Sequence, residues 1–297
     1  MARRRFFVEA VRNERAEVSG DTAEHLRRVL RVEAGQRFEI ADNQSVYLAE
    51  VEGFRKDRVL FHVLERLEAE APPVRVILLA SLIKFDRFEW IVEKATELGA
   101  EAIVPVEAER SEKGLAKAAA KRVERWRRIA LESSQQSRRS RLPEIESSVS
   151  FERALGIGEV AAEFAGNRSL TVAARKLTEP RASASGVAVN SADTSAAVLR
   201  YFLDEERGAP PLASILPSAE RRSPSDLVCL LAGPEGGWSG GERNTAGAHG
   251  WTPVTLGPQI LRAETAALAA LAVIVNAWII PPPALPRSPA PSPPESS

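Results

Sequence analysis

Two glycine-containing segments in the last quarter of the chain could bind a ligand through backbone groups. GPEGG at residues 233–237 follows an apolar run, and LGPQILR at residues 256–262 follows another such run. Glycine allows a ligand to approach the backbone closely, and open α/β sheets bind ligands at the loops that follow their strands. A single loop of this composition is most often a structural turn. The pair, in equivalent positions, predicts one shared cofactor site.

Arg262 and Glu264 end the second loop and are the side chains there with reactive chemistry. A guanidinium stabilises developing negative charge, and a carboxylate accepts protons. Each also has a structural interpretation. Arg262 would form a salt bridge with Glu235 or Glu264, and Glu264 would favour the dipole of the helix that begins there. Both interpretations stay open for Arg262, capping is favoured for Glu264, and no general base is assigned.

The segments that must position these loops have the pattern of an α/β domain. Strands are predicted at residues 74–82, 102–106, 227–231 and 252–256. The first is a continuous apolar run, which is typical of a strand buried on both faces. Helical periodicity is found at residues 86–98 and 115–136, and Ser239 with Glu242 has the spacing of a capping box that starts a short helix. Strands that alternate with helices predict a parallel sheet.

Residues 176–225 interrupt this pattern. They are rich in serine, alanine, proline and charged residues, so much of the stretch is predicted to be a surface insertion. Helices are expected within it only at residues 196–203 and 212–216, and a strand is expected before it at residues 170–174. Residues 281–297 have the composition of a disordered, proline-rich tail.

The apolar segment at residues 263–280 predicts a long helix. It contains Glu264, Thr265 and Asn276 and falls short of the roughly 20 strongly apolar residues that a membrane span needs. We therefore expect it in the core or in a subunit interface.

Residues 1–70 have a different pattern, which predicts a small β-barrel or sandwich domain. Short β-like runs occur at residues 5–8, 36–41, 46–52 and 58–64, with one helical segment at residues 22–30. Ala71-Pro72-Pro73 marks the boundary, because proline fits poorly inside a strand or helix. The second domain is expected to extend over residues 74–280.

The composition limits the environment and the partners. Forty basic and 40 acidic residues leave no net charge, so attraction to nucleic acid must come from local patches. Cys229 is the single cysteine and lies in an apolar run, which predicts a buried thiol and a reducing compartment. The three histidines lack the spacing of metal ligands, and the first residues lack a signal-peptide pattern. A cytoplasmic protein without a metal is predicted.

Two basic patches are candidates for an RNA contact. Residues 110–141 contain eleven Lys or Arg against three acidic residues, and a second group of arginines lies near the amino terminus. A charge run is usually only a solvated face, but two such runs on a neutral protein favour a nucleic-acid surface. The predicted RNA-binding residues are Arg3, Arg4, Arg5, Arg12, Arg27, Arg28, Arg31, Lys84, Arg110, Gln136, Arg138 and Arg139.

A third glycine motif is a weak candidate for a dinucleotide-binding site. GIGEVA at residues 156–161 matches G-x-G-x-x-A, and Glu179 follows at the distance of a ribose-binding acid. The preceding residues 151–155 look helical, so the motif is expected to be a loop between short helical pieces. A nicotinamide-dependent oxidoreductase is accordingly a distant alternative.

Several segments, in order, resemble blocks of the RsmE family of RNA methyltransferases. The carboxyl-terminal blocks are LLAGPEGGWSGGE and TLGPQILRAETA, and the middle blocks are EWIVEKATELGA after Lys84, IVPVEAERS and ERWRRIALESSQQSRRSRLPEI. HLRRVLRVEAGQ is similar to the amino-terminal PUA-like domain. The chain departs from the family at residues 170–177 and in the length of the following segment. In the knotted fold of that family, a loop in this region contacts the cofactor, so the contacting residue of that first knot loop stays open.

The resemblance implies a fold, a reaction and a set of cofactor residues. The fold is a SPOUT trefoil-knotted α/β domain with a small PUA-like β-barrel, assembled as a homodimer. The reaction is transfer of a methyl group from S-adenosyl-L-methionine to N3 of a uridine in 16S rRNA or the small ribosomal subunit. The implied cofactor-binding residues are Leu231, Gly233, Pro234, Glu235, Gly236, Gly237, Leu256, Gly257, Ile260 and Leu261.

Two alternatives stay open beside this function. One is a SPOUT enzyme that acts on another RNA or at a 2′-hydroxyl, and the other is a non-catalytic ribosome-assembly protein that binds RNA.

Uridine N3 loses a proton in the expected reaction, so the site must stabilise charge on the uracil oxygens or supply a base. Arg262 and Glu264 are the catalytic candidates.

Overall fold

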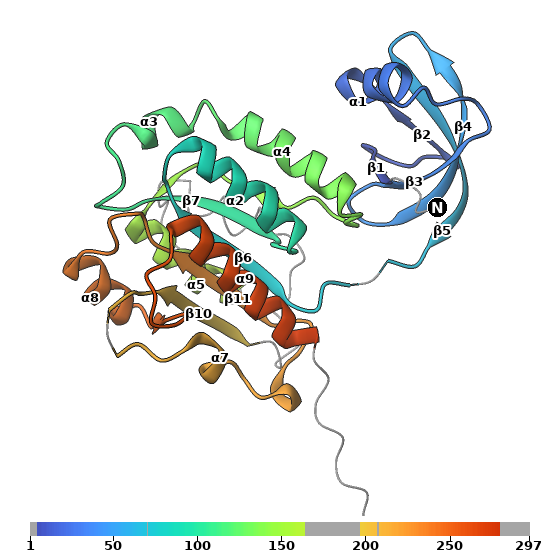
Figure 1. The fold of residues 1–297 in the computed structure, drawn as a ribbon. Helices are drawn as coiled ribbons and strands as arrows, with labels where there is room; N and C mark the ends of the chain where they lie inside the picture. Colours follow the sequence, from blue (N-terminus) through green and yellow to red (C-terminus); the bar gives the residue numbers. More distant parts are fainter. Residues whose placement is uncertain (1–4, 70, 164–196, 207, 280–297) are drawn as a thin grey trace, which may run out of the picture.

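The computed structural model describes residues 5–69, 71–163, 197–206 and 208–279 (Figure 1). Figure 1 shows a small domain built from the amino-terminal strands and a larger α/β domain built from the rest of the chain. The strand expected at residues 170–174, the tail at residues 281–297, Glu179, and Arg3 with Arg4 lie outside the described residues.

The amino-terminal domain contains one five-stranded mixed sheet. Its elements are β1 (Arg5–Phe7), β2 (Arg15–Val18), α1 (Gly20–Glu24), the π-helix η1 (His25–Val29), β3 (Arg37–Ala41), β4 (Val46–Arg55) and β5 (Arg58–Leu67). The strand order is β1-β3-β4-β5-β2, in which only β1 and β3 pair in parallel. Leu26 of η1 packs with Ile40 and Phe61 in the core. β2 was not predicted, because charged residues occupy every second position of its four residues and leave only a weak apolar pattern.

The larger domain contains a parallel sheet. Its strands are β6 (Arg75–Ser81), β7 (Ala102–Glu107), β8 (Glu144–Ile145), β9 (Val149–Ser150), β10 (Val198–Leu203), β11 (Leu227–Ala232) and β12 (Thr252–Val254). The order is β12-β10-β11-β6-β7-β8, β9 also pairs with β7, and every pairing is parallel. The carboxyl ends of β10, β11 and β12 therefore lie at one edge of the sheet.

Helices cover both faces of this sheet. They are α2 (Phe85–Glu97), α3 (Leu115–Ala119), α4 (Val123–Gln136), α5 (Phe151–Glu163), α7 (Leu212–Ile215), the 3₁₀ helix η2 (Ala219–Arg221), α8 (Gly240–Ala248) and α9 (Ala263–Ile279). The helix predicted over residues 115–136 is two helices, because the backbone makes a turn in which Arg122 N–H donates to Ala119 O at 2.8 Å. No helix in the described part of the chain has the length and hydropathy to cross a bilayer.

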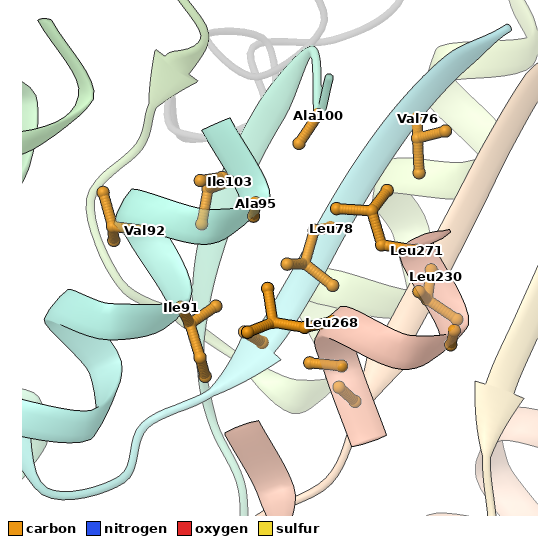
Figure 2. Packing of buried hydrophobic residues seen from close by; sticks show 14 of the residues in the cluster. Val76, Leu78, Ile91, Val92, Ala95, Ala100, Ile103, Leu230, Leu268 and Leu271 are labelled. Carbon is orange, nitrogen blue, oxygen red and sulfur yellow. The ribbon is translucent and has the colours of Figure 1, made fainter. Parts of the chain in front are cut away.

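Alternate residues of each central strand pack on opposite faces. Leu78 of β6 lies in one cluster and Leu79 in the other. Figure 2 shows the first cluster, in which Ile91 of α2 and Leu268 and Leu271 of α9 gather beside β6. α5 and α8 contribute to the second cluster. This two-sided burial explains why the apolar runs of β6 and β11 were predictable as strands.

β10 corrects the prediction of a helix at residues 196–203. It pairs with β11 on one side and β12 on the other, with Tyr201 opposite Leu230 and Thr252. A short apolar run is compatible with either period, and long-range pairing decides it here. The predicted surface insertion at residues 176–225 is therefore wrong at its carboxyl-terminal part, which supplies a central strand. The helix predicted at residues 212–216 is confirmed by α7.

α5 corrects the loop predicted at residues 156–161. The helix is continuous over Phe151–Glu163 and includes both glycines of the G-x-G-x-x-A match. A phosphate-binding motif requires these glycines in a turn between a strand and a helix. The motif is not a dinucleotide site, and the oxidoreductase alternative loses its basis.

The two domains meet at a buried carboxylate. Glu39 of β3 accepts hydrogen bonds from Arg5 Nε at 3.1 Å and Nη2 at 2.8 Å, and it forms an ion pair with Arg138, which follows α4. Leu142 N–H donates to Asn43 Oδ1 at 2.9 Å beside this pair. Arg5 Nη1 also donates to Arg138 O, so Arg5 and Arg138 link the two domains. The RNA contact expected of these two arginines stays a prediction.

Cys229 is buried in β11, as predicted, and its environment has a measurable consequence. Burial raises the pKa of the thiol from 9.0 to about 12. The native state disfavours the thiolate, so this group's contribution to stability is complete below pH 9 and is lost as pH rises toward 12. We expect the free energy of unfolding of wild type to fall by about 1.4 kcal/mol per pH unit in this range relative to Cys229→Ala. Urea unfolding at several pH values measures this free energy. Parallel plots of unfolding free energy against pH for the wild type and Cys229→Ala would contradict the prediction.

Candidate cofactor site and RNA-binding surface

The first loop, residues 233–239, depends on glycine at three positions. A Cβ on Gly233 would lie 3.0 Å from the Trp238 indole, and one on Gly236 would lie 3.1 Å from Arg110 Cβ. Gly237 has φ +66°, and its Cβ would meet Glu205 Oε1 at 2.2 Å. Residues 233–237, which we call the glycine cradle, are therefore packed closely against the side chains of Trp238, Arg110 and Glu205.

A capping box fixes the helix that follows this loop, as predicted. Ser239 Oγ accepts from Glu242 N–H at 3.2 Å, and Glu242 Oε2 accepts from Ser239 N–H at 2.9 Å. Glu242 Oε1 also accepts from Glu109 N–H at 2.8 Å. Arg110 Nη1 then donates to Gly236 O at 3.1 Å. The loop after β7 is thus attached to the first glycine loop.

The second loop follows β12 and presents apolar side chains to solvent. Thr255 Oγ1 donates to Gly257 O at 3.1 Å, and Gly257 has φ +142°, a conformation that favours glycine. Ile260 is 86% exposed and Leu261 38% exposed. Exposed apolar groups of this size in a fixed loop provide contact area for a ligand or a partner.

The loop after β10 completes the edge, and the sequence analysis missed it. Asp204 is buried and accepts from Arg243 Nε and Nη2 at 3.0–3.1 Å. These hydrogen bonds raise the pKa of Arg243. Trp238 Nε1 donates to Leu203 O at 2.7 Å. Because residues 196–203 were predicted as a helix, Asp204 was not recognised as the residue after a strand, which was the available signal.

Arg87 of α2 joins the two glycine loops. Its guanidinium forms an ion pair with Glu235 of the first loop, and its Nε lies 3.9 Å from Glu264 Oε1 at the end of the second. The loops therefore converge within the reach of one side chain, as the sequence predicted. Arg87 itself was missed, since only its position in the first turn after a strand could have indicated it.

Arg262 and Glu264 have different environments. Arg262 is exposed, and no ion pair is found for it among the described residues. The carboxylates named in its salt-bridge interpretation, Glu235 and Glu264, contact Arg87 instead, so that one of the two open interpretations does not hold in this structure. Glu264 is buried, and its Oε2 has no hydrogen-bond partner in the part of the chain that the structure describes. That oxygen is a buried acceptor whose hydrogen-bonding capacity the described residues leave unsatisfied.

The sequence comparisons agree with this geometry. Residues 70–166 and 176–275 match the model of an RNA methyltransferase domain, and residues 18–64 match that of an RNA methyltransferase PUA domain. The chain is 32% identical over 253 residues to ribosomal RNA small subunit methyltransferase E of Synechocystis sp., covering 84% of this chain and 69% of the relative. The chain belongs to the ribosomal RNA small subunit methyltransferase E family. The Bacillus subtilis member is 29% identical over 279 residues, which cover 91% of this chain and 95% of that protein.

Solved structures confirm the predicted fold class for this family member. The methyltransferase E of Neisseria gonorrhoeae, solved bound to S-adenosyl methionine, has a TM-score of 0.71 and 26% identity, covering 93% of this chain and 98% of that one. A Legionella pneumophila methyltransferase, solved with the same cofactor, has a TM-score of 0.68 at 24% identity, covering 93% of this chain and 98% of that one. The α/β domain is thus of the SPOUT class and the amino-terminal domain is PUA-like.

The residues of this methyltransferase fit S-adenosylmethionine. The cofactor has an apolar adenosine surface, polar edges that bind backbone groups, and a cationic end. The glycine cradle would supply the backbone groups, and Leu256, Ile260 and Leu261 would supply apolar contacts. The buried Glu264 Oε2, which has no partner among the described residues, would accept a hydrogen bond from a donor of the cofactor. A hollow of about 370 Å³ lies elsewhere, at the amino-terminal end of β10 near Gly250, so a hollow of this size does not by itself locate the cofactor site.

The predicted RNA-binding residues of the methyltransferase divide into two groups. Arg139 is held in place by donating to Thr96 O at 2.7 Å and Ala100 O at 2.8 Å, and burial lowers its pKa to about 10. Like Arg5 and Arg138, it makes structural contacts, and the RNA contact expected of these three arginines stays a prediction. The second group consists of predicted RNA-binding residues that are exposed, namely Arg12, Arg27, Arg28, Arg31, Lys84, Arg110 and Gln136.

Proposed function

We propose that this protein is a cytoplasmic homodimer that transfers the methyl group of S-adenosylmethionine to N3 of a uridine in 16S rRNA. The observation that carries the proposal is the convergence of both glycine loops on Arg87, which creates one site from the ends of β11 and β12. Membership in the methyltransferase E family supports the rRNA substrate. S-adenosylmethionine supplies a methyl group that its sulfonium has already activated.

The residues of the chain position the reactants and stabilise charge. The glycine cradle and the apolar residues of the second loop hold the cofactor, and they exclude water from the methyl group. Arg262 is exposed beside the second loop and has no carboxylate partner among the described residues, so it can contact the uracil oxygens as N3 loses its proton. Glu264 has one carboxylate oxygen available to accept a hydrogen bond from the bound ligand.

The outward face of α9 supports the homodimer. Thr265, Ala269, Ala272, Asn276 and Ile279 recur at helical spacing and are at least partly exposed, and this face carries no charged residue. α9 also packs on β6 and β11 beside the site (Figure 1). A partner subunit that covers this face would place the site near the subunit boundary. Light scattering is expected to show a dimer for the wild type and a monomer for Ala269→Arg.

The path of the chain supports the knot that the family resemblance implies. After β11 the chain crosses β10 to form β12 on the far side, and α9 then returns to pack on β11 and β6. The return must pass the loop that follows β10. A trefoil arises if the chain passes through that loop.

Exposed arginines of the amino-terminal domain support an RNA footprint. Arg27 lies over the Phe54 ring at 5.8 Å, and the exposed Arg28 and Arg31 follow it in sequence. We expect the triple variant R12A/R28A/R31A to weaken binding of a 16S rRNA fragment. The slope of log K against log salt should fall by about 0.7–0.9 for each phosphate that the protein no longer neutralises.

Filter binding between 50 and 200 mM salt, roughly the range in which such contacts are sensitive, measures this change in slope. Arg37→Ala, whose side chain pairs with Glu50, is the matched control. Affinity of the wild type that barely changes with salt would contradict this footprint.

Methylation of purified small subunits with labelled S-adenosylmethionine tests the function. The expected product is 3-methyluridine, identified by mass spectrometry of the nucleosides. A 2′-O-methylated nucleoside, or label in another RNA, would contradict the proposed specificity and would identify a SPOUT enzyme with a different target. Absence of cofactor binding in calorimetry would instead favour a non-catalytic assembly protein.

A further inference from the structure

Arg87 contacts one carboxylate from each glycine loop. Its side chain is 33% exposed and forms an ion pair with Glu235, which is 43% exposed. Its Nε lies 3.9 Å from Glu264 Oε1, in a side chain that is only 8% exposed. Arg87 belongs to α2, which packs against α9 through the core shown in Figure 2. The guanidinium is thus attached to the rigid part of the domain while its partners lie on both loops.

Glu264 gives this contact its energetic importance. A buried carboxylate is costly unless a cation or hydrogen-bond donors compensate for lost hydration. Arg87 is the cation within 4.0 Å of Glu264 in the described part of the chain. The other oxygen, Oε2, is buried and has no hydrogen-bond partner there. One oxygen therefore faces Arg87, and the second is left for a donor that the protein does not supply.

We infer that Arg87 is a positioning residue, which sets the separation of the two cofactor loops through Glu235 and directs the second oxygen of Glu264 to an N–H donor of the bound ligand. The inference rests on the proposed function. The donor is an amino group of the cofactor or the imino N3–H of uracil, and both present the same chemistry to a carboxylate oxygen. Arg87 contacts neither reactant and acts through the two carboxylates.

Double-mutant cycles test this role. Arg87→Ala is combined with Glu235→Gln and with Glu264→Gln, and each protein is measured for S-adenosylmethionine Kd by calorimetry and for kcat and KM with small subunits. We expect Arg87→Ala to lower kcat/KM by roughly 100-fold, the effect of misplacing reacting groups by about 1 Å. Each double variant should lose little more than Arg87→Ala alone, because residues in one network are not additive. Arg87→Lys should recover part of the loss, since it keeps the charge without the planar fork.

The two readouts locate the donor. If the donor belongs to the cofactor, Glu264→Gln and Arg87→Ala weaken S-adenosylmethionine binding in the absence of RNA. If it belongs to uracil, Glu264→Gln binds the cofactor normally and loses kcat, whereas Arg87→Ala still weakens cofactor binding because the two loops lose their separation. Lys94→Ala is the matched control, because Lys94 is a cation on α2 that pairs only with its helix neighbours Glu93 and Glu97 among the described residues. This control is expected to be unchanged in both measurements.

Specific outcomes overturn the inference. Additive losses in both cycles, or an Arg87→Ala variant with wild-type Kd, kcat and KM, would remove Arg87 from this role. If Arg87→Ala does not fold, as judged by circular dichroism, the same cycles with Arg87→Lys decide the question. Failure of the proposed function is distinguishable, because the wild-type protein itself would then neither bind S-adenosylmethionine nor methylate the subunit.

Discussion

Replacing Arg262 with alanine is expected to lower kcat for methyl transfer by about 100- to 1000-fold, the range for loss of one donor that stabilises transition-state charge. The fold and the dimer should be unchanged, because Arg262 is exposed and makes no side-chain ion pair among the described residues. The measurement is single-turnover methylation of small subunits at saturating S-adenosylmethionine.

The control for this variant is Arg221→Ala, another exposed arginine, which lies in η2. It should retain wild-type turnover. Cofactor affinity should also be unchanged in Arg262→Ala, since the guanidinium acts on the base. Near-normal turnover in Arg262→Ala would exclude this residue from the mechanism.

Replacing Gly237 with alanine is expected to damage cofactor binding. Its φ of +66° is a conformation that side chains rarely adopt, and the new Cβ would meet Glu205 Oε1 at 2.2 Å. Glu205 is flexible and can move, but the backbone strain of about 1–3 kcal/mol cannot be avoided without changing the loop. We expect S-adenosylmethionine affinity to fall by roughly tenfold for each 1.4 kcal/mol by which the bound loop conformation is disfavoured. Calorimetry without RNA gives this value directly.

Gly247→Ala provides the matched comparison. Gly247 lies in α8, its φ is not positive, and nothing lies within 4 Å of the added Cβ. Alanine is favoured over glycine in a helix by about 0.5–1 kcal/mol, so this variant should be slightly more stable and should bind the cofactor normally. Equal cofactor affinity in Gly237→Ala and the wild type would show that the cradle tolerates a side chain.

The RNA-binding prediction shows how tertiary contacts change the role of a charged residue. Twelve residues were predicted, eleven from two basic runs and Lys84 beside a block of the family resemblance, and their sequence context did not distinguish among them. Arg5 and Arg138 contact the buried Glu39 at the domain interface, and Arg139 donates to backbone carbonyls of the α/β domain. These partners come from distant parts of the chain, so no local pattern reveals them.

The amino-acid sequence by itself determined the parts of this protein whose physics is local. Continuous apolar runs specify strands buried on both faces, the Ser239–Glu242 spacing specifies the start of α8, and glycine at residues 233–237 specifies a close-packed turn. Each of these depends on neighbours within a few residues. Both glycine loops were therefore predictable, together with the family to which the chain belongs.

Only the tertiary structure decided the features that depend on long-range contacts. The run at residues 198–203 became a strand because β11 and β12 provide partners on both sides, although its apolar pattern also suits a helix. Arg87 acquired its position because α2 lies beside the ends of two loops that come much later in the chain. Pairing between distant segments has no signature within either segment, and for this reason the strand beside the site and the arginine that joins its loops were found only in the folded chain.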